Sequence, residues 1–153
     1  MTYLSAFPEE KYDKNSEQYF EWPKQADLVN LKLTEPLILK SVRTKSMYSW
    51  ISSIQFVFNN GIESPFIKGS QSGYISQVEL SGTKIGKIVP SHDNSDTGII
   101  KFVHENGSQV IFSHYNAKHS STLIVPESHY IVGFYGMINF EKLKNLGFIL
   151  AKF

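Results

Sequence analysis

An internal repeat of 46 residues constrains the fold of this sequence more than any other feature. Apolar residues recur at this spacing in three copies, most clearly at Phe56, Phe102 and Phe148. Four further columns keep the same offset without a gap: Ile54/Ile100/Leu146, Val57/Val103/Ile149, Val42/Ile88/Phe134 and Leu39/Ile85/Ile131. Self-similarity at a fixed period indicates one supersecondary unit used several times. We therefore interpret the chain as three copies of one folding unit.

Each copy has the composition of β-structure. Val, Ile, Phe and Tyr dominate short apolar runs, which Gly, Asn, Ser and Pro interrupt. The pattern predicts about four strands per copy, near 31–33, 37–43, 51–58 and 62–67, and again 46 and 92 residues later. Asn60-Gly61 and Asn106-Gly107 have the chemistry of tight hairpin turns. Three such units predict an all-β fold closed around a threefold axis, and a β-prism and a β-trefoil both fit this period.

The segment from Tyr130 to Leu150 reads YIVGFYGMINFEKLKNLGFIL. It resembles the last repeat of the jacalin-like lectin domains, in which a GFxG sequence, a loop and a final apolar strand follow one another. The resemblance implies a β-prism with pseudo-threefold symmetry, built from three Greek-key four-stranded sheets, and favours that fold over the β-trefoil. It also implies that an N-terminal strand completes the third sheet.

The third copy is one strand short at its C-terminal end, because its fourth strand would begin at residue 154. Tyr19–Trp22 (YFEW) is the β-like run upstream, and Pro23 would end it. We therefore expect this run to form the outer or closing strand of the third sheet. We expect residues 1–18 to be a polar extension that is disordered or docks on another protein chain, and residues 19–153 to form the β-prism domain.

Composition and charge narrow the class of protein. A chain of 153 residues fits one domain, and 15 basic against 14 acidic residues leave a formal charge of +1. This balance provides no electrostatic footprint for nucleic acid or an anionic membrane. The sequence has no cysteine, no signal-peptide pattern at its start and no apolar stretch long enough to span a membrane. These features predict a soluble intracellular protein, without indicating an organelle.

The family resemblance implies a principal sugar site, and this sequence departs from it. In jacalin-like lectins a sugar lies between a Gly-rich loop and a loop that ends in G-x-x-x-D. Aligned back from Gly147, the motif Asp falls on Lys144 and the motif Gly on Phe140. The opposing loop would be Pro23–Asp27, which contains no glycine. We therefore expect this site to be lost.

The corresponding loops of the first two copies are the candidate carbohydrate sites. Small glycines allow close backbone approach, aromatic rings stack on a sugar face, and carboxylate or amide oxygens accept hydrogen bonds from hydroxyls. In the alternative interpretation both loops are ordinary solvated turns, because the same residue types form turns for local reasons. The candidates are Gly69 and Gly73 facing Tyr48 and Trp50 in the first copy, and Asp93, Asn94 and Asp96 facing His114, Tyr115 and Asn116 in the second.

Neither catalysis nor metal binding is indicated. The sequence contains no nucleophile elbow, phosphate loop or paired-carboxylate pattern, so we expect no enzymatic activity and no cofactor. The run DNSDTG lacks the acidic spacing of a calcium loop. Strand alternation would place His114 and His119 on opposite faces, which disfavours zinc. His104 stands where the other copies have Phe58 and Leu150, so we interpret it as a histidine at the edge of the core.

Two classes of function fit these features. The first is a non-catalytic structural or interaction subunit that docks within a larger assembly of protein chains. The loss of the principal sugar site and the aromatic residues within the first 22 positions favour this class. The alternative is a carbohydrate-binding lectin module that uses the loops of the first and second copies to bind a glycan. A shared fold alone does not decide between them.

Overall fold

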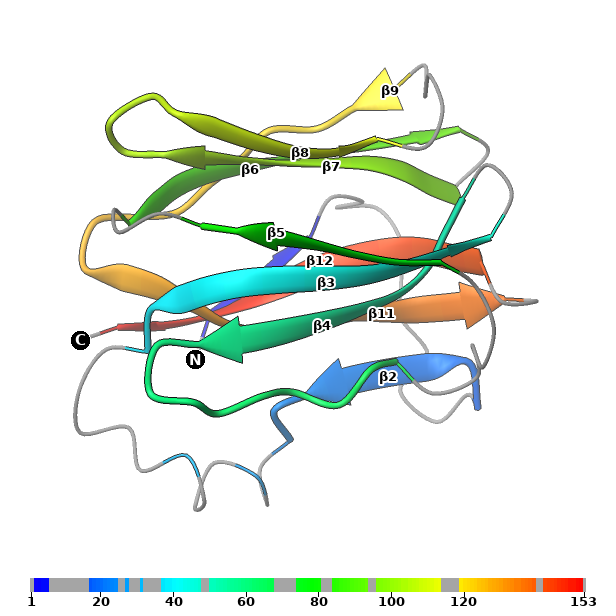
Figure 1. Ribbon diagram of the computed structural model, residues 1–153, viewed down its shortest axis with the longest axis horizontal. Helices are drawn as coiled ribbons and strands as arrows, with labels where there is room; N and C mark the ends of the chain where they lie inside the picture. The colour runs from blue at the N-terminus through cyan, green and yellow to red at the C-terminus, as the bar shows by residue number, and fades with distance from the viewer. Residues whose placement is uncertain are drawn as a thin grey trace.

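Three β-sheets form the sides of a prism around one core (Figure 1). The structure is a computed structural model, and it describes residues 2–5, 17–24, 27, 31, 37–47, 50–67, 74–80, 84–93, 96–113, 119–139 and 142–152. Within these residues every strand pair is antiparallel. The predicted all-β prism with pseudo-threefold symmetry is confirmed, and the β-trefoil alternative is not what forms.

Each sheet has a long central hairpin from one copy of the repeat. In the first sheet the order is β4 (Trp50–Phe58), β3 (Leu39–Met47), β5 (Tyr74–Glu79). In the second it is β8 (Gln109–Ser113), β7 (Asp96–His104), β6 (Ile85–Asp93), with β9 (His119–Ser120) and β10 (Leu123–Ile124) sharing the outer place beside β6. In the third it is β1 (Thr2–Ser5), β12 (Lys142–Lys152), β11 (His129–Asn139), β2 (Tyr19–Trp22).

The three hairpins are equivalent in register, including their irregularities. Each has two β-bulges, at which one residue is skipped by the pairing. Near the open end of the hairpins the skipped residues are Lys40, Gly86 and Val132. Near the tips they are Ser52, Gly98 and Lys144. Both sets are spaced by 46 residues, so the repeat in the sequence is a repeat of backbone geometry as well as of apolar side chains.

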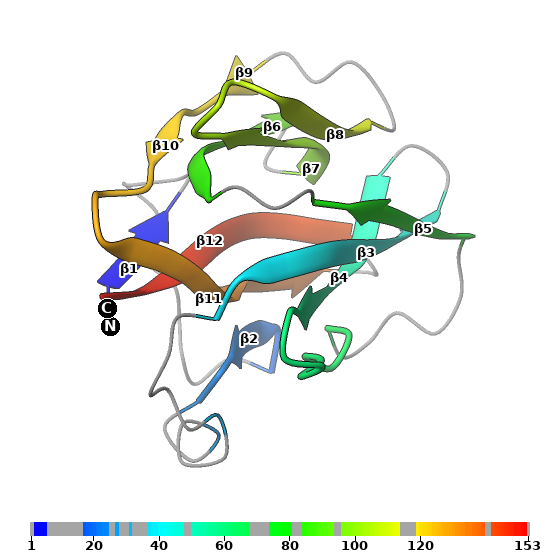
Figure 2. The same cartoon turned by 60° about the vertical axis from the view of Figure 1, so that its left-hand side comes forward.

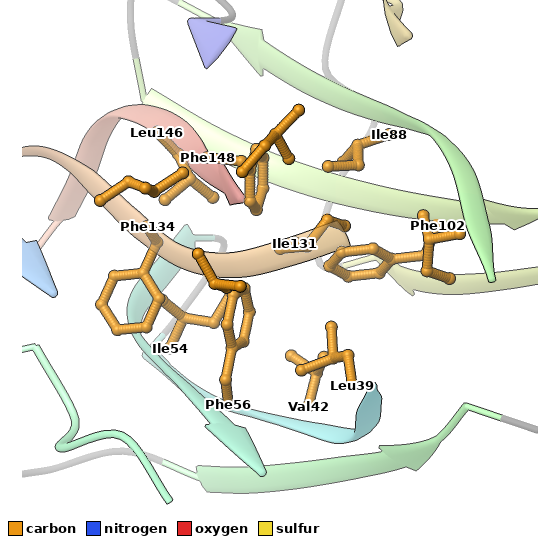
Figure 3. Packing of buried hydrophobic residues seen from close by; sticks show 14 of the residues in the cluster. Leu39, Val42, Ile54, Phe56, Ile88, Phe102, Ile131, Phe134, Leu146 and Phe148 are labelled. Atoms are coloured by element: carbon orange, nitrogen blue, oxygen red, sulfur yellow. The ribbon is translucent and has the colours of Figure 1, made fainter. Parts of the chain in front are cut away.

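Four of the five apolar columns of the repeat lie wholly in the buried core, and Figure 3 shows members of each of the four, whereas Val57 and Val103 of the fifth column are outside the core cluster. Phe56, Phe102 and Phe148 are completely buried. The Phe148 ring lies 6.4 Å from the Phe56 ring and 6.2 Å from the Phe102 ring, measured between centroids. The predicted core is therefore confirmed, and each sheet contributes one phenylalanine to its middle. His104 is also buried, at 3% exposure, as its place in the repeat predicts.

The two Asn-Gly turns are confirmed and have the same geometry. Gly61 and Gly107 have φ of +87° and +89°, a left-handed conformation that favours glycine. In both turns the asparagine side chain accepts a backbone hydrogen bond at 3.0 Å, from the N–H of Ile62 or of Ser108. Asparagine stabilises such turns through bonds of this kind.

Two strands from the N-terminal region complete the third sheet, at its two outer edges (Figure 2). Tyr19–Trp22 forms β2 beside β11, as the sequence predicts for an outer strand. The fourth strand of the third copy, which would begin after residue 153, is replaced by β1, in which Tyr3 pairs with Ile149 of β12. The expected polar extension over residues 1–18 is therefore wrong for residues 2–5, because the unpaired edge of β12 offers them backbone hydrogen bonds. Residues 6–16 lie outside the described part.

Two other expected strands differ from the prediction. Leu31 is buried with helical backbone conformation, so the strand expected near 31–33 does not begin there, and residues 32 and 33 lie outside the described part. The segment 62–67 follows β4 without forming a regular strand, and it is tied to β4 by a bridge between Val57 and Glu63. The Ser64 hydroxyl accepts the Phe56 N–H at 2.8 Å, a bond that replaces a ladder partner. Across the described residues, no helix has the length and hydropathy to cross a membrane.

Candidate functional site

The tips of the three central hairpins lie at one end of the prism, which we call the hairpin end (Figure 1). The closing residue pairs of the three hairpins are related by the 46-residue offset. They are Met47 with Trp50, Asp93 with Asp96, and Asn139 with Lys142. Since the hairpins are equivalent, the closing pairs of the three sheets are related positions at this end of the prism.

In the second sheet, both flanking strands have an end close to the hairpin tip. Asp93 and Asp96 face each other across the tip as a backbone pair. The segment 114–118 begins after Ser113, which pairs with Ile99, and ends before His119, which pairs with His92. Both ends of this segment are therefore fixed close to the aspartate pair. The candidates Asn94, His114, Tyr115 and Asn116 lie outside the described residues.

The first sheet repeats this arrangement. Its tip closes with the pair of Met47 and Trp50, and Tyr74 at the start of β5 pairs with Ser46. On the other flank the Ser53 hydroxyl donates to the Ile67 carbonyl oxygen at 3.3 Å. The segment 68–73 therefore also begins and ends beside a hairpin tip. The candidates Tyr48, Gly69 and Gly73 belong to stretches that the structure does not describe.

In the third sheet the opposing loop is not the one that the sequence alignment suggests. Ser5 pairs with Gly147 and Tyr19 pairs with Met137, so the segment between β1 and β2 is the one fixed beside this tip. Trp22 pairs with Phe134, and the chain then leaves towards the opposite end of the prism. The expectation that Pro23–Asp27 opposes the tip is therefore wrong, because β2 runs antiparallel to β11. Residues 6–18, which take its place, contain no glycine either.

A cavity of about 240 Å³ lies elsewhere, on the side of the prism. We call it the β2 groove, because it runs between β2 and the segment that follows β4, two parts of the chain that lie side by side in Figures 1 and 2. No local pattern in the sequence indicates this groove, because its two sides lie more than 40 residues apart along the chain. Its lining residues are Tyr19, Phe20, Glu21, Trp22, Lys24, Pro65, Phe66, Ile67 and Phe134.

Aromatic packing and charge both shape the β2 groove. The Trp22 ring stacks on Phe58 with centroids 6.0 Å apart, and Phe20 lies 6.1 Å from Phe134, so both rings are anchored on the core. The Tyr19 hydroxyl donates to Glu21 Oε1 at 2.5 Å, which orients the carboxylate. The Lys45 Nζ lies 4.3 Å from the centroid of the Phe66 ring. The groove therefore combines apolar rings with one acid and nearby ammonium groups.

The described side chains contain no group of three or more His, Asp or Glu residues placed to hold a metal ion. His104 is packed in the core, beneath the turn that Gly107 closes. His129 lies near the opposite end of β11 from the hairpin tip, and its Nδ1 is 3.0 Å from the Glu127 carbonyl oxygen.

The arrangement of sheets is shared with solved structures of lectins. The prostate-specific WGA16 glycoprotein lectin superposes with a TM-score of 0.69 at 16% identity, over 94% of this chain and 96% of that chain. Malaysian banana lectin gives 0.60 at 15% identity over 93% and 95%. Artocarpin, in its mannotriose complex, gives 0.59 at 12% identity over 74% and 83%.

Sequence comparison adds no closer relationship. No family model matches the sequence, and no curated protein matches it significantly. At identities of this size, the likeness to the solved structures concerns the fold. The three-sheet architecture, the equivalent bulged hairpins and these superpositions together lead to one conclusion. The chain has the β-prism fold of the jacalin-like lectins.

Proposed function

We propose that this chain is a carbohydrate-binding module that uses the loops at the hairpin end of its first and second sheets. The fold supports the proposal, because the solved structures that share it include artocarpin bound to mannotriose and a mannose-binding lectin from Champedak. The observation that carries it is the backbone pair of Asp93 and Asp96 at the hairpin tip, with the residues on both sides of the segment 114–118 paired close to it.

The residue types around the second tip suit sugar recognition. Asp93 and Asp96 would supply ionised carboxylates, which accept hydrogen bonds from sugar hydroxyls. Asn94 and Asn116 would add amide donors and acceptors, and Tyr115 a ring for an apolar sugar face. The first tip offers Tyr48 and Trp50 with the small residues Gly69 and Gly73, but no carboxylate. We therefore assign the stronger site to the second sheet.

The third tip is not expected to bind sugar in the family manner. Lys144, at the skipped position of the β12 bulge, replaces the aspartate of the family motif. An ammonium group donates hydrogen bonds but accepts none, so it cannot replace a carboxylate as acceptor. A sugar bound between this tip and residues 6–18 through backbone groups would contradict this expectation.

The experiment combines a glycan array with calorimetry on the best ligand. Asp96→Ala should weaken binding about tenfold or more, since it removes a charged acceptor. Glu127→Ala is the matched control, because Glu127 is an exposed acid near the opposite end of the prism. Circular dichroism checks that both variants remain folded. An array without binding would refute the proposal, and equal affinities for the parent chain and Asp96→Ala would refute the assignment of the stronger site to the second sheet.

The other candidate function, a non-catalytic subunit that docks in an assembly through residues 1–18, has less support. The aromatic residues of the N-terminal region are one of its two grounds, and Thr2–Ser5 in this region pairs with β12 inside the third sheet. Gln18 is also bonded to the third sheet, because its carbonyl oxygen accepts a hydrogen bond from the Ile138 N–H of β11 at 2.9 Å. An assembly function would therefore have to use residues 6–16 or another surface.

A further inference from the structure

We infer that the β2 groove is a separate carbohydrate subsite, which takes a single neutral pyranose ring. The inference rests on the proposed function, but it concerns the side of the prism and not the loops at the hairpin end. A cavity of about 240 Å³ is smaller than the roughly 300–1,000 Å³ of pockets for drug-sized ligands. It therefore suits one ring rather than an extended molecule.

The aromatic lining of the groove is not imposed by the repeat. Trp22 pairs with Phe134 in the third sheet, and the equivalent pair in the first sheet is Val78 with Val42. In the same way, Phe20 on β2 corresponds to Ser76 on β5. Phe20 pairs with Gly136 and Ser76 pairs with Thr44, and these two partners are equivalent positions of the repeat. The outer strand of the first sheet therefore has no ring at the positions that correspond to Phe20 and Trp22.

The concentration of rings in the groove is a feature that the pseudo-threefold fold does not require. Five of its lining residues are aromatic: Tyr19, Phe20, Trp22, Phe66 and Phe134. Rings of this kind offer flat apolar surface at low cost in side-chain entropy. The C–H face of a pyranose is a ligand surface that matches them.

The charged groups at the groove favour a neutral polyhydroxylated ligand over a cation. An aromatic cage next to a carboxylate would ordinarily suit a quaternary ammonium. Here Lys24 lines the groove, and the Lys45 ammonium already lies over the Phe66 ring at 4.3 Å. Like charges would therefore repel a cationic ligand. Sugar hydroxyls can instead accept from Lys24 and donate to the carboxylate of Glu21.

Two tryptophans make the test specific to each site. The chain contains Trp22, which lines the β2 groove, and Trp50, which closes the first hairpin tip. Their indole N–H signals in an NMR spectrum, assigned with Trp22→Phe and Trp50→Phe, report the two regions separately. The folded full chain is titrated with an excess of methyl α-mannoside, methyl β-glucoside and methyl β-galactoside, and with choline as the cationic probe.

A saturable shift of the Trp22 signal with at least one of the glycosides is the expected result. Glu21→Gln should weaken that affinity about fivefold, because a charged acceptor becomes a neutral one. Phe66→Ala should weaken it as well. Glu79→Gln, the same change on an exposed residue of β5, should leave it unchanged.

Three outcomes would overturn the inference in distinguishable ways. A shift of the Trp50 signal alone, or glycan-array binding without any shift of Trp22, would leave the proposed function standing without the groove. A Trp22 shift with choline and with none of the glycosides would identify a cation site. A negative array together with two unmoved indole signals would remove both the subsite and the proposed function.

Discussion

Gly133 lies so close to Trp22 that a Cβ atom at position 133 would overlap the Trp22 carbonyl oxygen. The same atom would also overlap Cδ of Pro23. Glycine therefore allows β2 to leave the third sheet directly over β11. The two other copies have Ser41 and Lys87 at this position, so the requirement is specific to the sheet that β2 completes.

Replacing Gly133 by alanine should destabilise the domain. We expect Gly133→Ala to lower the free energy of unfolding by about 1–3 kcal/mol or more, because backbone atoms must move to admit the methyl group. Urea unfolding measures this change. Gly86→Ala is the matched control, since its Cβ would meet Glu105 Cγ at 3.5 Å, an ordinary contact. Equal stability of the two variants would contradict the packing described for Gly133.

The three central phenylalanines should be equally sensitive to truncation. Phe56→Ala, Phe102→Ala and Phe148→Ala should each lower the free energy of unfolding by roughly 3–5 kcal/mol, because each leaves a cavity in a closed core. Ile111→Ala provides the exposed comparison and should have little effect, as Ile111 is 50% exposed. A phenylalanine whose truncation costs no more than Ile111→Ala would show that its copy does not share the common core.

Removal of the N-terminal strand should weaken the third sheet. A chain that begins at residue 17 lacks β1, and we expect it to lose roughly 2–5 kcal/mol, since four backbone pairs with β12 disappear. A chain that begins at residue 6 should lose nearly the same amount. Thermal unfolding of both truncations tests the pairing. An unchanged Tm in both would mean that β1 contributes nothing to the stability of the domain.

The two Asn-Gly turns should respond alike to substitution. A Cβ at Gly61 or Gly107 would meet nothing within 4 Å, so the cost of alanine is the left-handed backbone alone. We expect Gly61→Ala and Gly107→Ala to lower the free energy of unfolding by about 1–2 kcal/mol each. Asparagine at either position should cost less, because it tolerates this conformation better. Clearly unequal effects of the two alanine variants would argue against equivalent turns.

The sequence predicted the central hairpins because their burial imposes a fixed spacing. Phe56, Phe102 and Phe148 must meet at one axis, so each copy keeps an aromatic residue at the same place, and the pattern is visible without structure. The same constraint identified His104 as a core residue. This regular spacing of buried residues is found in the central hairpins, whose core side chains point to the centre of the prism.

The strand β1 and the β2 groove escaped prediction for the opposite reason. β1 has four residues, and its partner segment Gly147–Leu150 lies at the other end of the chain, so nothing local indicates the pairing. The groove forms where β2 approaches Phe66, more than 40 residues away in the sequence. The position of Tyr19 near the third hairpin tip likewise depends on the direction of β2, which no local pattern specifies.

The pairing of β1 with β12 means that the repeat is closed as a ring without a covalent link. After β7 the chain turns through Asn106-Gly107 into β8, whereas β12 receives its corresponding neighbour from the opposite end of the chain. We therefore expect that the chain termini could be moved to another of the equivalent turns without a change of fold. A circular permutant with a short linker from Phe153 to Met1, opened at Asn106-Gly107, would make the third unit continuous and divide the second. Its folding would show that the architecture depends on cyclic order and not on a particular first residue.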